Sequence, residues 1–308
     1  MTPTQPPGGV GHIGERPVAR IGYGAMSLAT GSTDDSSALL HRAAELGVNH
    51  IDTASFYADG EVNRRIRQAL APYPDDLVLV SKVGARSVTG NTPLALAQKP
   101  AELRGAIDLD LAGLGLDSIP VVNLRRADIG PGLVAEGDQV VDLDDQLAEM
   151  IALRDEGKIG AIGISNIDLP TLRQALPAGI VCVQNAYSLL DRKREDLLEL
   201  CVEQDIAWVP YFPLGSAFPG FPKVAENPVV QRIAAEIDAT SAQVGLAWLL
   251  SHAPNTLLIA GTASITHLQE NLRAGELRLS ADQLADLDAV PSGDLPHGDG
   301  VEAFLDKG

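Results

Sequence analysis

The sequence predicts a single-domain α/β protein, a (β/α)₈ TIM-type barrel, on the basis of three observations. Short apolar runs alternate with amphipathic stretches along nearly all of the 308 residues, a pattern typical of parallel strands connected by helices. The alternation yields about eight strands, and no linker or change of composition divides them. Together these observations favour a closed barrel over a doubly wound sheet with a second domain.

The first half of the chain contains four predicted strands and three predicted helices. The strands cover residues 20–23, a segment that begins at His50, residues 77–82 and residues 119–124. The helices cover residues 35–46, 61–70 and 100–114. Asp34 is the expected N-cap of the first helix and Gly47 its stop, and a proline at its first turn supports the third helix.

The second half repeats this scheme. We expect helices at residues 143–156, 169–176, 194–204, 241–251 and 265–273, and strands at 159–164, 180–184, 207–211 and 256–260. A last helix at 281–290 and a glycine-rich tail complete a barrel domain that spans residues 18–308. Residues 1–17 are rich in proline and glycine and lack the apolar core of a secretory signal, so we expect a loose N-terminal arm.

Composition excludes several classes of function. The formal net charge of −18 disfavours a nucleic-acid partner, because such proteins concentrate lysine and arginine. No apolar run reaches the roughly 18 residues of a membrane-spanning helix. Cys182 and Cys201 lack a CxxC spacing, and the six histidines lack the spacings of metal ligands. We expect a soluble, cytoplasmic monomer or weak oligomer with a small-molecule partner, no metal and no membrane contact.

Polar residues follow the predicted strands. In a barrel of this type the chemistry lies where strands end and the following loops begin. The residues at these positions are Asp52, Lys82, Arg125, Ser165, Asn166, Gln184, Tyr211, Gly261 and Thr262. Seven strands therefore direct polar groups at one mouth.

Asp52, Tyr57 and Lys82 suit the reduction of a carbonyl group. That reaction needs a hydride on the carbon and a proton for the oxygen. An ammonium beside a phenol favours the phenolate and lowers the phenol pKa, and a carboxylate can hold the ammonium in place. Tyr57 is then the acid, Lys82 the group that tunes it and Asp52 the anchor. The alternative is a structural Asp52–Lys82 ion pair beside an aromatic residue at the rim. A Schiff-base role for Lys82, as in a barrel aldolase, is a further alternative that the tyrosine argues against.

Several short motifs, in order, resemble the aldo-keto reductases over nearly the whole chain. Tyr57 lies five residues after Asp52, and Lys82 closes the third strand. The motifs downstream are GISN at 163–166, VQNAY at 183–187, YFPLG at 211–215, Gly261-Thr262 and Glu270-Asn271. The resemblance implies a barrel that transfers hydride between a nicotinamide cofactor and a carbonyl compound.

The resemblance also implies a set of cofactor-binding residues. Ser165, Asn166 and Gln184 would bind the nicotinamide carboxamide, and Tyr211 would stack on the ring. The remaining expected contacts are Gly24, Pro213, Leu214 and Gly215, and at the adenosine end Gly261, Thr262, Ser264, His267, Glu270 and Asn271. We expect NADPH, with NADH possible because Gly261 and His267 stand where many relatives have basic residues.

The fourth catalytic residue departs from the family pattern. A histidine is usual at the end of the fourth strand, and Arg125 stands there in this chain. An arginine offers fixed donors to a developing oxyanion and keeps a positive charge beside Tyr57. The alternative is that Arg125 neutralises an acidic neighbour in a site without activity. Asn123 faces the same side of the strand and is expected to support Arg125.

Longer stretches resemble the bacterial pyridoxal reductases of this family. They include IGYGA at 21–25, GVNHIDT at 47–53 and IVCVQN at 180–185. The resemblance implies reduction of pyridoxal to pyridoxine with NADPH. Two alternatives stay open: reduction of another aldehyde, ketone or sugar intermediate, or a regulatory protein that binds a nicotinamide and turns over little substrate.

Overall fold

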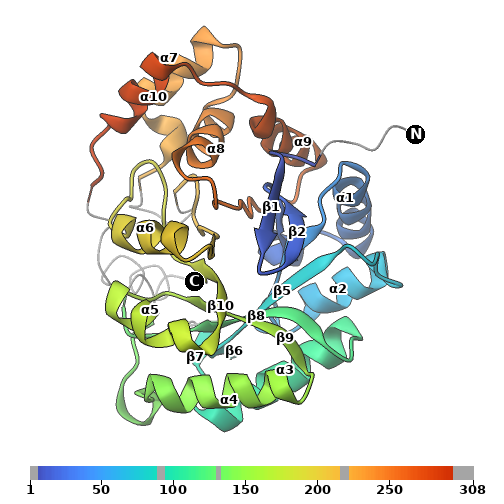
Figure 1. Ribbon diagram of the computed structural model, residues 1–308. Helices are drawn as coiled ribbons and strands as arrows, with labels where there is room; N and C mark the ends of the chain where they lie inside the picture. Colours follow the sequence, from blue (N-terminus) through green and yellow to red (C-terminus); the bar gives the residue numbers. More distant parts are fainter. Residues whose placement is uncertain (1–5, 89–93, 130–132, 216–221, 294–308) are drawn as a thin grey trace.

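A curled parallel sheet forms the centre of the molecule (Figure 1). The computed structural model describes residues 6–88, 94–129, 133–215 and 222–293. Within these ranges the sheet has the strand order β11-β10-β9-β8-β5-β4-β3. The strands are β3 (Tyr23–Gly24), β4 (His50–Asp52), β5 (Val78–Val83), β8 (Ile119–Arg125), β9 (Ile159–Ser165), β10 (Ile180–Gln184) and β11 (Ala207–Trp208).

The expected strand at residues 256–260 closes the sheet through single bridges. Thr256 pairs with Trp208 beside β11, and Leu258 pairs with Ile21 beside β3, both in parallel orientation. The Leu257 N–H donates to the Trp208 carbonyl at 2.8 Å, and the Leu258 N–H donates to the Arg20 carbonyl at 2.8 Å. This segment therefore occupies the eighth position, and the predicted TIM-type barrel in one domain is confirmed.

A β-hairpin precedes the barrel. Its strands β1 (Val10–Ile13) and β2 (Arg16–Ala19) pair in antiparallel orientation. Ile13 and Val18 are buried in the same cluster as Val78, near the start of a barrel strand. The expectation of a loose arm was wrong for residues 10–17, because these two apolar side chains cover the end of the barrel where the strands begin.

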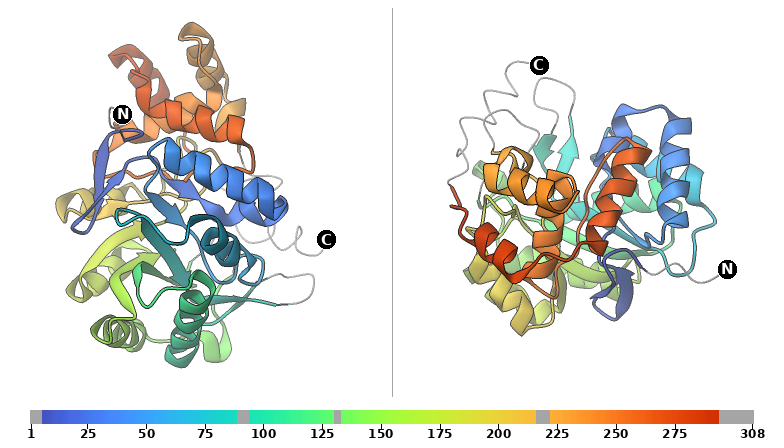
Figure 2. Two further views of the ribbon diagram at one scale, coloured as in Figure 1. Left: turned by 90° about the vertical axis from the view of Figure 1, so that its right-hand side faces the viewer. Right: turned by 90° about the horizontal axis from the view of Figure 1, so that it is seen from above.

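Helices surround the sheet (Figure 2). They are α1 (Thr33–Glu45), α2 (Glu61–Leu70), α3 (Pro100–Leu114), α4 (Leu143–Asp155), α5 (Leu169–Ala175), α6 (Glu195–Glu203), α7 (Pro228–Glu236), α8 (Ser241–His252), α9 (Ile265–Arg273) and α10 (Ala281–Asp288). Short 3₁₀ turns cover Ala25–Thr30, Gly137–Gln139, Leu176–Ala178, Val224–Glu226 and Ala274–Glu276, and the strands β6 (Ala85–Ser87) and β7 (Leu94–Leu96) form a second hairpin.

The structure differs from the prediction at the start of α1, before α8 and in β11, among other places. Ser32, not Asp34, is the N-cap of α1, and its hydroxyl oxygen accepts a hydrogen bond from the Asp35 N–H. Helix α7 was missed, although Asn227 before Pro228 is a strong start signal and caps two N–H groups. The strand expected at 207–211 is shorter and ends at Trp208.

Side chains alternate between the two faces of the barrel strands. Val78, Val80 and Val121 point inward and pack in the barrel interior. Leu79 and Val122, their chain neighbours, point outward into the layer between sheet and helices. The same alternation sends Asp52 and Lys82 inward at the carboxyl ends of β4 and β5, where the candidate site lies.

Candidate active site

The ammonium of Lys82 is the centre of the candidate site. It donates to Asp52 Oδ1 in a short ion pair, to the Thr53 carbonyl at 3.0 Å and to Tyr57 Oη at 3.0 Å. These three acceptors use all three N–H groups of the lysine. The Tyr57 oxygen therefore accepts from Lys82, and its own O–H remains for another partner. Sequence reasoning missed the Thr53 carbonyl, because any residue type can supply a backbone acceptor.

Burial dominates the pKa of Tyr57. Burial raises that pKa above 10, while Lys82 and Arg125 each lower it and Asp52 raises it. The expectation that the cations bring the phenol pKa below its usual value was therefore wrong. For Lys82, burial lowers the pKa but Asp52 and Tyr57 outweigh it, so the net pKa is raised and the ammonium stays charged. The site thus holds a protonated phenol beside a permanent cation.

Arg125 brings a second cation to this mouth. Its Nη1 atom is buried and has no hydrogen-bond partner among the described residues. The acidic neighbour, Asp128, pairs with Arg126 instead at 2.7 Å. Burial lowers the pKa of Arg125, and the phenols of Tyr211 and Tyr57 raise it. The guanidinium therefore retains a donor that meets no acceptor in the described part of the chain, which disfavours the idea that it neutralises an acidic neighbour.

Asn123 does not support Arg125 as expected. Its Oδ1 accepts from the Cys182 thiol at 3.3 Å, and its Nδ2 has no partner among the described side chains. A Cβ at Gly163 would lie 2.1 Å from Asn123 Oδ1, so a glycine is needed opposite this amide. Asn123 is thus packed across the barrel toward β9 and β10.

Gln184 joins the predicted trio. Its Nε2 donates to Asp52 Oδ2 at 2.8 Å, and its Oε1 is buried without a partner in the described structure. Ser165, at the end of β9, is also buried. The Asp52 carboxylate is therefore held on both oxygens, while one acceptor of Gln184 stays available.

The amide of Asn166 is largely committed to the protein. Its Nδ2 donates to the carbonyls of Arg126 at 3.0 Å and Ile129 at 2.7 Å, and its Oδ1 accepts from the Tyr211 hydroxyl at 3.2 Å. Asn166 also has a positive φ of 59°. Asn166 therefore holds Tyr211 and the loop after β8. Both N–H groups of its amide are bonded within the protein, so fewer donors remain for a nicotinamide carboxamide than were expected from the sequence.

The loop after Tyr211 turns tightly. The Gly215 N–H donates to the Phe212 carbonyl at 2.9 Å, and Pro213 and Gly215 form an isolated β-bridge. Gly215 has a φ of +86°, and a Cβ there would lie 2.2 Å from the Pro222 carbonyl. Leu214 packs against the core. The need for glycine at 215 thus arises from a close approach within the chain.

The expected adenosine end lies around the start of α9. The Thr262 hydroxyl oxygen accepts from the Ser264 N–H at 3.0 Å, and the Ser264 oxygen accepts from the His267 N–H at 3.4 Å. Both hydroxyl groups therefore keep their O–H donors. His267 is exposed, whereas Glu270 and Asn271 are half-buried further along the helix.

Close backbone approaches at Gly24 and Gly261 bring β3 next to the segment before α9. A Cβ at Gly24 would lie 2.4 Å from the Ile259 carbonyl, and one at Gly261 would lie 2.7 Å from the Gly24 carbonyl. The Tyr23 hydroxyl donates to the Thr262 carbonyl at 2.7 Å. The first strand and the eighth position are therefore in backbone contact where the cofactor residues were expected.

The described ranges contain neither a cluster of metal-binding side chains nor a membrane-spanning helix. No group of three or more His, Cys, Asp or Glu side chains there has an arrangement that could hold a metal ion. None of the helices described is long and apolar enough to cross a membrane.

The sequence matches a known protein family. The model of the aldo/keto reductase family matches residues 20–291, which cover β3 through α10 and every candidate residue. The chain belongs to the aldo/keto reductase family. It is therefore an oxidoreductase, and the resemblance inferred from the sequence motifs is confirmed.

Individual relatives agree with this assignment. Pyridoxine 4-dehydrogenase of Escherichia coli is 40% identical over 90% of this chain and 96% of its own. Methylglyoxal reductase YeaE of the same organism is 32% identical over 82% of each chain. The crystal structure of an aldo-keto reductase from Klebsiella pneumoniae in complex with NADPH has a TM-score of 0.75 at 27% identity, covering 93% of this chain and 94% of the other.

Proposed function

We propose that this protein reduces an aldehyde, pyridoxal to pyridoxine, with NADPH as the hydride donor and Tyr57 as the general acid. The observation that carries the proposal is the direction of one hydrogen bond. Lys82 Nζ donates to Tyr57 Oη, so the phenol O–H is free to donate to a substrate oxygen. The 40% identity to pyridoxine 4-dehydrogenase supports the choice of substrate.

The chain's own residues account for the proton transfer. Because burial keeps the phenol protonated, Tyr57 meets the substrate as an acid. Its proton moves to the carbonyl oxygen, and the resulting phenolate lies beside the Lys82 ammonium and within the field of Arg125. Asp52 holds the ammonium in place. Water from the mouth of the barrel then restores the proton.

Several unused groups fit a nicotinamide cofactor. The buried Oε1 of Gln184 needs a donor, which a carboxamide N–H supplies. Ser165, Gln184 and the Oδ1 of Asn166 would hold the carboxamide, and Tyr211 would face the ring. When bound, the cofactor supplies the hydride that the substrate carbon receives.

The other expected contacts extend away from this point. Gly24, Pro213, Leu214 and Gly215 would line the path of the pyrophosphate. The free O–H donors of Thr262 and Ser264, with His267, would hold the adenosine phosphate, and Glu270 and Asn271 would face the adenosine. Anion-binding donors at the start of α9 support NADPH over NADH.

Arg125 supports the choice of pyridoxal as the proposed substrate. Pyridoxal is an aromatic aldehyde with a phenolic oxygen beside the carbonyl, and the unpartnered Nη1 of Arg125 is a donor for such an oxygen. The guanidinium would also polarise the carbonyl as negative charge develops on it.

We propose the cytoplasm as the compartment, since Cys182 and Cys201 are free thiols. We further propose a monomer or weak oligomer, because one chain supplies the whole candidate site. Gel filtration with light scattering over a range of concentrations tests the oligomeric state.

The direct test follows NADPH oxidation against pyridoxal, simple aromatic aldehydes, methylglyoxal and sugars, with Tyr57→Phe measured in parallel. We expect pyridoxal to have the highest kcat/KM and Tyr57→Phe to lose turnover. Faster turnover of another carbonyl would reject pyridoxal but keep the reductase. NADPH binding without turnover of any compound would reject both in favour of a regulatory role.

A further inference from the structure

Four polar side chains are buried on the outer face of β4 and β5, behind the candidate site. Thr53 and Ser81 come from the strand ends, Asn63 from α2 and Asp110 from α3. Each of the four is 0% exposed. The sequence prediction missed this group, although Asn63 and Asp110 are polar residues on the buried faces of amphipathic helices.

Hydrogen bonds join the four side chains into one network. The Thr53 hydroxyl donates to Asn63 Oδ1, Asn63 Nδ2 donates to Asp110 Oδ1, and the Ser81 hydroxyl donates to Asp110 Oδ2, each at 2.7 Å. Burial raises the pKa of Asp110, while the Ser55 hydroxyl and the positive charge of Lys82 both lower it. Both carboxyl oxygens of Asp110 therefore have a donor.

The network connects back to the reactive ammonium at both ends. Thr53 supplies the carbonyl that accepts from Lys82 Nζ at 3.0 Å, and Ser81 is the chain neighbour of Lys82. The path from Lys82 through Thr53, Asn63, Asp110 and Ser81 thus returns to Lys82. A shift at Asp110 would move the strand ends that hold both the ammonium and one of its acceptors.

The apolar surroundings of the four side chains argue against a role in stability alone. Helices α2 and α3 otherwise face the strands with apolar side chains, among them Val62, Ile66, Leu103 and Ile107. A carboxyl group buried among neutral partners costs free energy, and apolar residues of similar size often give equal or greater stability. A network of this kind is therefore better explained by a demand for precise placement.

We propose that Asp110 is a positioning residue for the reduction: it holds Ser81 directly and Thr53 through Asn63, so that Lys82 keeps its three acceptors and Tyr57 stays aligned as the acid. This inference rests on the proposed function. It assigns Asp110 no contact with substrate or cofactor.

Three variants test the proposal. Asp110→Leu leaves Ser81 and Asn63 without their acceptor, Ser81→Ala removes one arm of the network, and Asp110→Asn keeps a similar shape with an acceptor. We expect Asp110→Leu to lower kcat by about tenfold to a hundredfold, since small misplacements of catalytic groups have effects of this size. Ser81→Ala should lower kcat by about threefold to tenfold, and Asp110→Asn should recover at least half of the loss on a logarithmic scale. The KM for the carbonyl and the Kd for NADPH should stay within about twofold of wild type.

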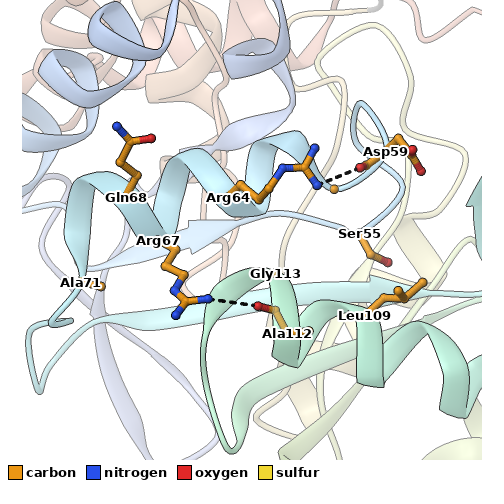
Figure 3. A pocket seen from close by; sticks show the side chains of 10 residues that line it. Ser55, Asp59, Arg64, Arg67, Gln68, Ala71, Leu109, Ala112 and Gly113 are labelled. Carbon is orange, nitrogen blue, oxygen red and sulfur yellow. Dashed lines mark hydrogen bonds between the residues drawn. The ribbon is translucent and has the colours of Figure 1, made fainter.

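Matched controls come from the same two helices. Asp108 lies two residues earlier on α3, and its exposed side chain pairs with Lys158. Arg67 of α2 donates to the Ala112 carbonyl of α3 across a surface cavity of about 620 Å³, which Ser55 also lines (Figure 3). Asp108→Asn removes a carboxylate and Arg67→Gln weakens helix packing, and neither touches the network. Both should leave kcat within about twofold, even where Arg67→Gln lowers the Tm.

A second measurement separates this inference from the proposed function. An ultraviolet difference titration of wild type against Tyr57→Phe reports the phenol pKa of Tyr57 without any turnover. Asp110→Leu and Ser81→Ala should shift that pKa, whereas Asp108→Asn should not. An unshifted pKa with wild-type kcat in Ser81→Ala would overturn the positioning role, even if Asp110→Leu failed to fold. A shifted pKa in an enzyme that reduces no carbonyl would reject the proposed function and retain the network.

Discussion

The two faces of β4 and β5 carry polar clusters of opposite character. On the inner face, Asp52 and Lys82 form an ion pair beside Tyr57, and Gln184 Oε1 and Arg125 Nη1 are left without partners among the described residues. On the outer face, each side-chain oxygen and nitrogen of Asn63 and Asp110 has a hydrogen-bond partner, and both side chains are fully buried. The inner face thus has buried polar atoms without a partner, whereas each polar side-chain atom of the described outer cluster has at least one.

The difference shows where a ligand is expected. A buried polar atom without a partner costs free energy, so it persists where something else completes it. The inner face, with its unused donor and acceptor, is suited to receive a cofactor amide and a carbonyl oxygen. The outer face is complete in itself and is suited to hold the inner face in place.

The largest expected effect is at Tyr57, the acid of the inner face. Tyr57→Phe removes the O–H that donates to the substrate, and we expect kcat to fall by about 10²- to 10⁴-fold, the usual contribution of a general acid. Stopped-flow and steady-state NADPH oxidation measure it. Tyr73→Phe is the matched control, because its hydroxyl binds the Leu114 carbonyl outside the barrel. Full activity of Tyr57→Phe would remove the inner face as the site of proton transfer.

A smaller effect is expected at Arg125. Arg125→Leu removes the unpartnered donor, and we expect pyridoxal reduction to slow by more than about tenfold through kcat/KM. Arg125→Lys keeps the charge but loses the planar fork, so it should recover part of the loss. The ratio of pyridoxal to benzaldehyde turnover in each variant is the measurement. An unchanged ratio and rate would show that unused donors on this face do not mark substrate contacts.

Much of the inner face could be predicted from sequence. Asp52, Tyr57 and Lys82 lie at strand ends that apolar runs identify, and a barrel brings such ends to one mouth. Helices α3 and α9 were predicted with the bounds that the structure shows, since Pro100 at the first turn and the capping Ser264 mark their starts. Local signals of this kind are contained in a few adjacent residues.

The rest depended on contacts between distant segments. The β1–β2 hairpin was taken as a loose arm because its glycines and prolines hide the burial of Ile13 and Val18. The phenol pKa of Tyr57 was expected to fall because the charges nearby are visible in the sequence, whereas the burial that raises it is not. Asn63 and Asp110 meet only after α2 and α3 pack together, and no spacing in the chain announces that.

The outer face should also be visible in the pH dependence of stability. Burial raises the pKa of Asp110 to about 7, so its contribution to stability is present below about pH 3.8 and is lost as the pH rises through 7. Burial lowers the pKa of His50, inside the barrel, to about 4. Its contribution is present above about pH 6.5 and is lost as the pH falls through 4. Between about pH 4 and pH 6.5 the two groups therefore change the free energy of unfolding in opposite directions, each by about 1.4 kcal/mol per pH unit.

Removing either group should uncover the other. In Asp110→Asn the free energy of unfolding should rise with pH more steeply than in wild type, by about 1 kcal/mol per pH unit. In His50→Leu the free energy of unfolding should rise with pH less steeply than in wild type, or fall. Urea unfolding at about pH 4.5 and about pH 6 measures both slopes. Parallel curves for wild type and Asp110→Asn would mean that this carboxyl titrates alike in the folded and unfolded chain, and so that the outer face does not bury it as described.

The smallest effect is expected at His267, at the far end of the inner mouth. Its ring is exposed at the start of α9, where the Thr262 and Ser264 hydroxyl oxygens already cap backbone N–H groups. An exposed ion pair contributes about 0.2–1 kcal/mol, so His267→Ala should weaken NADPH binding by about twofold to fivefold and leave NADH binding unchanged. His12→Ala, an exposed histidine on the hairpin at the opposite end of the barrel, is the control. Fluorescence titration with both cofactors measures the ratio. Equal weakening of NADPH and NADH would mean that His267 contacts a part common to both, and the preference for NADPH would then depend on the hydroxyl donors of Thr262 and Ser264 alone.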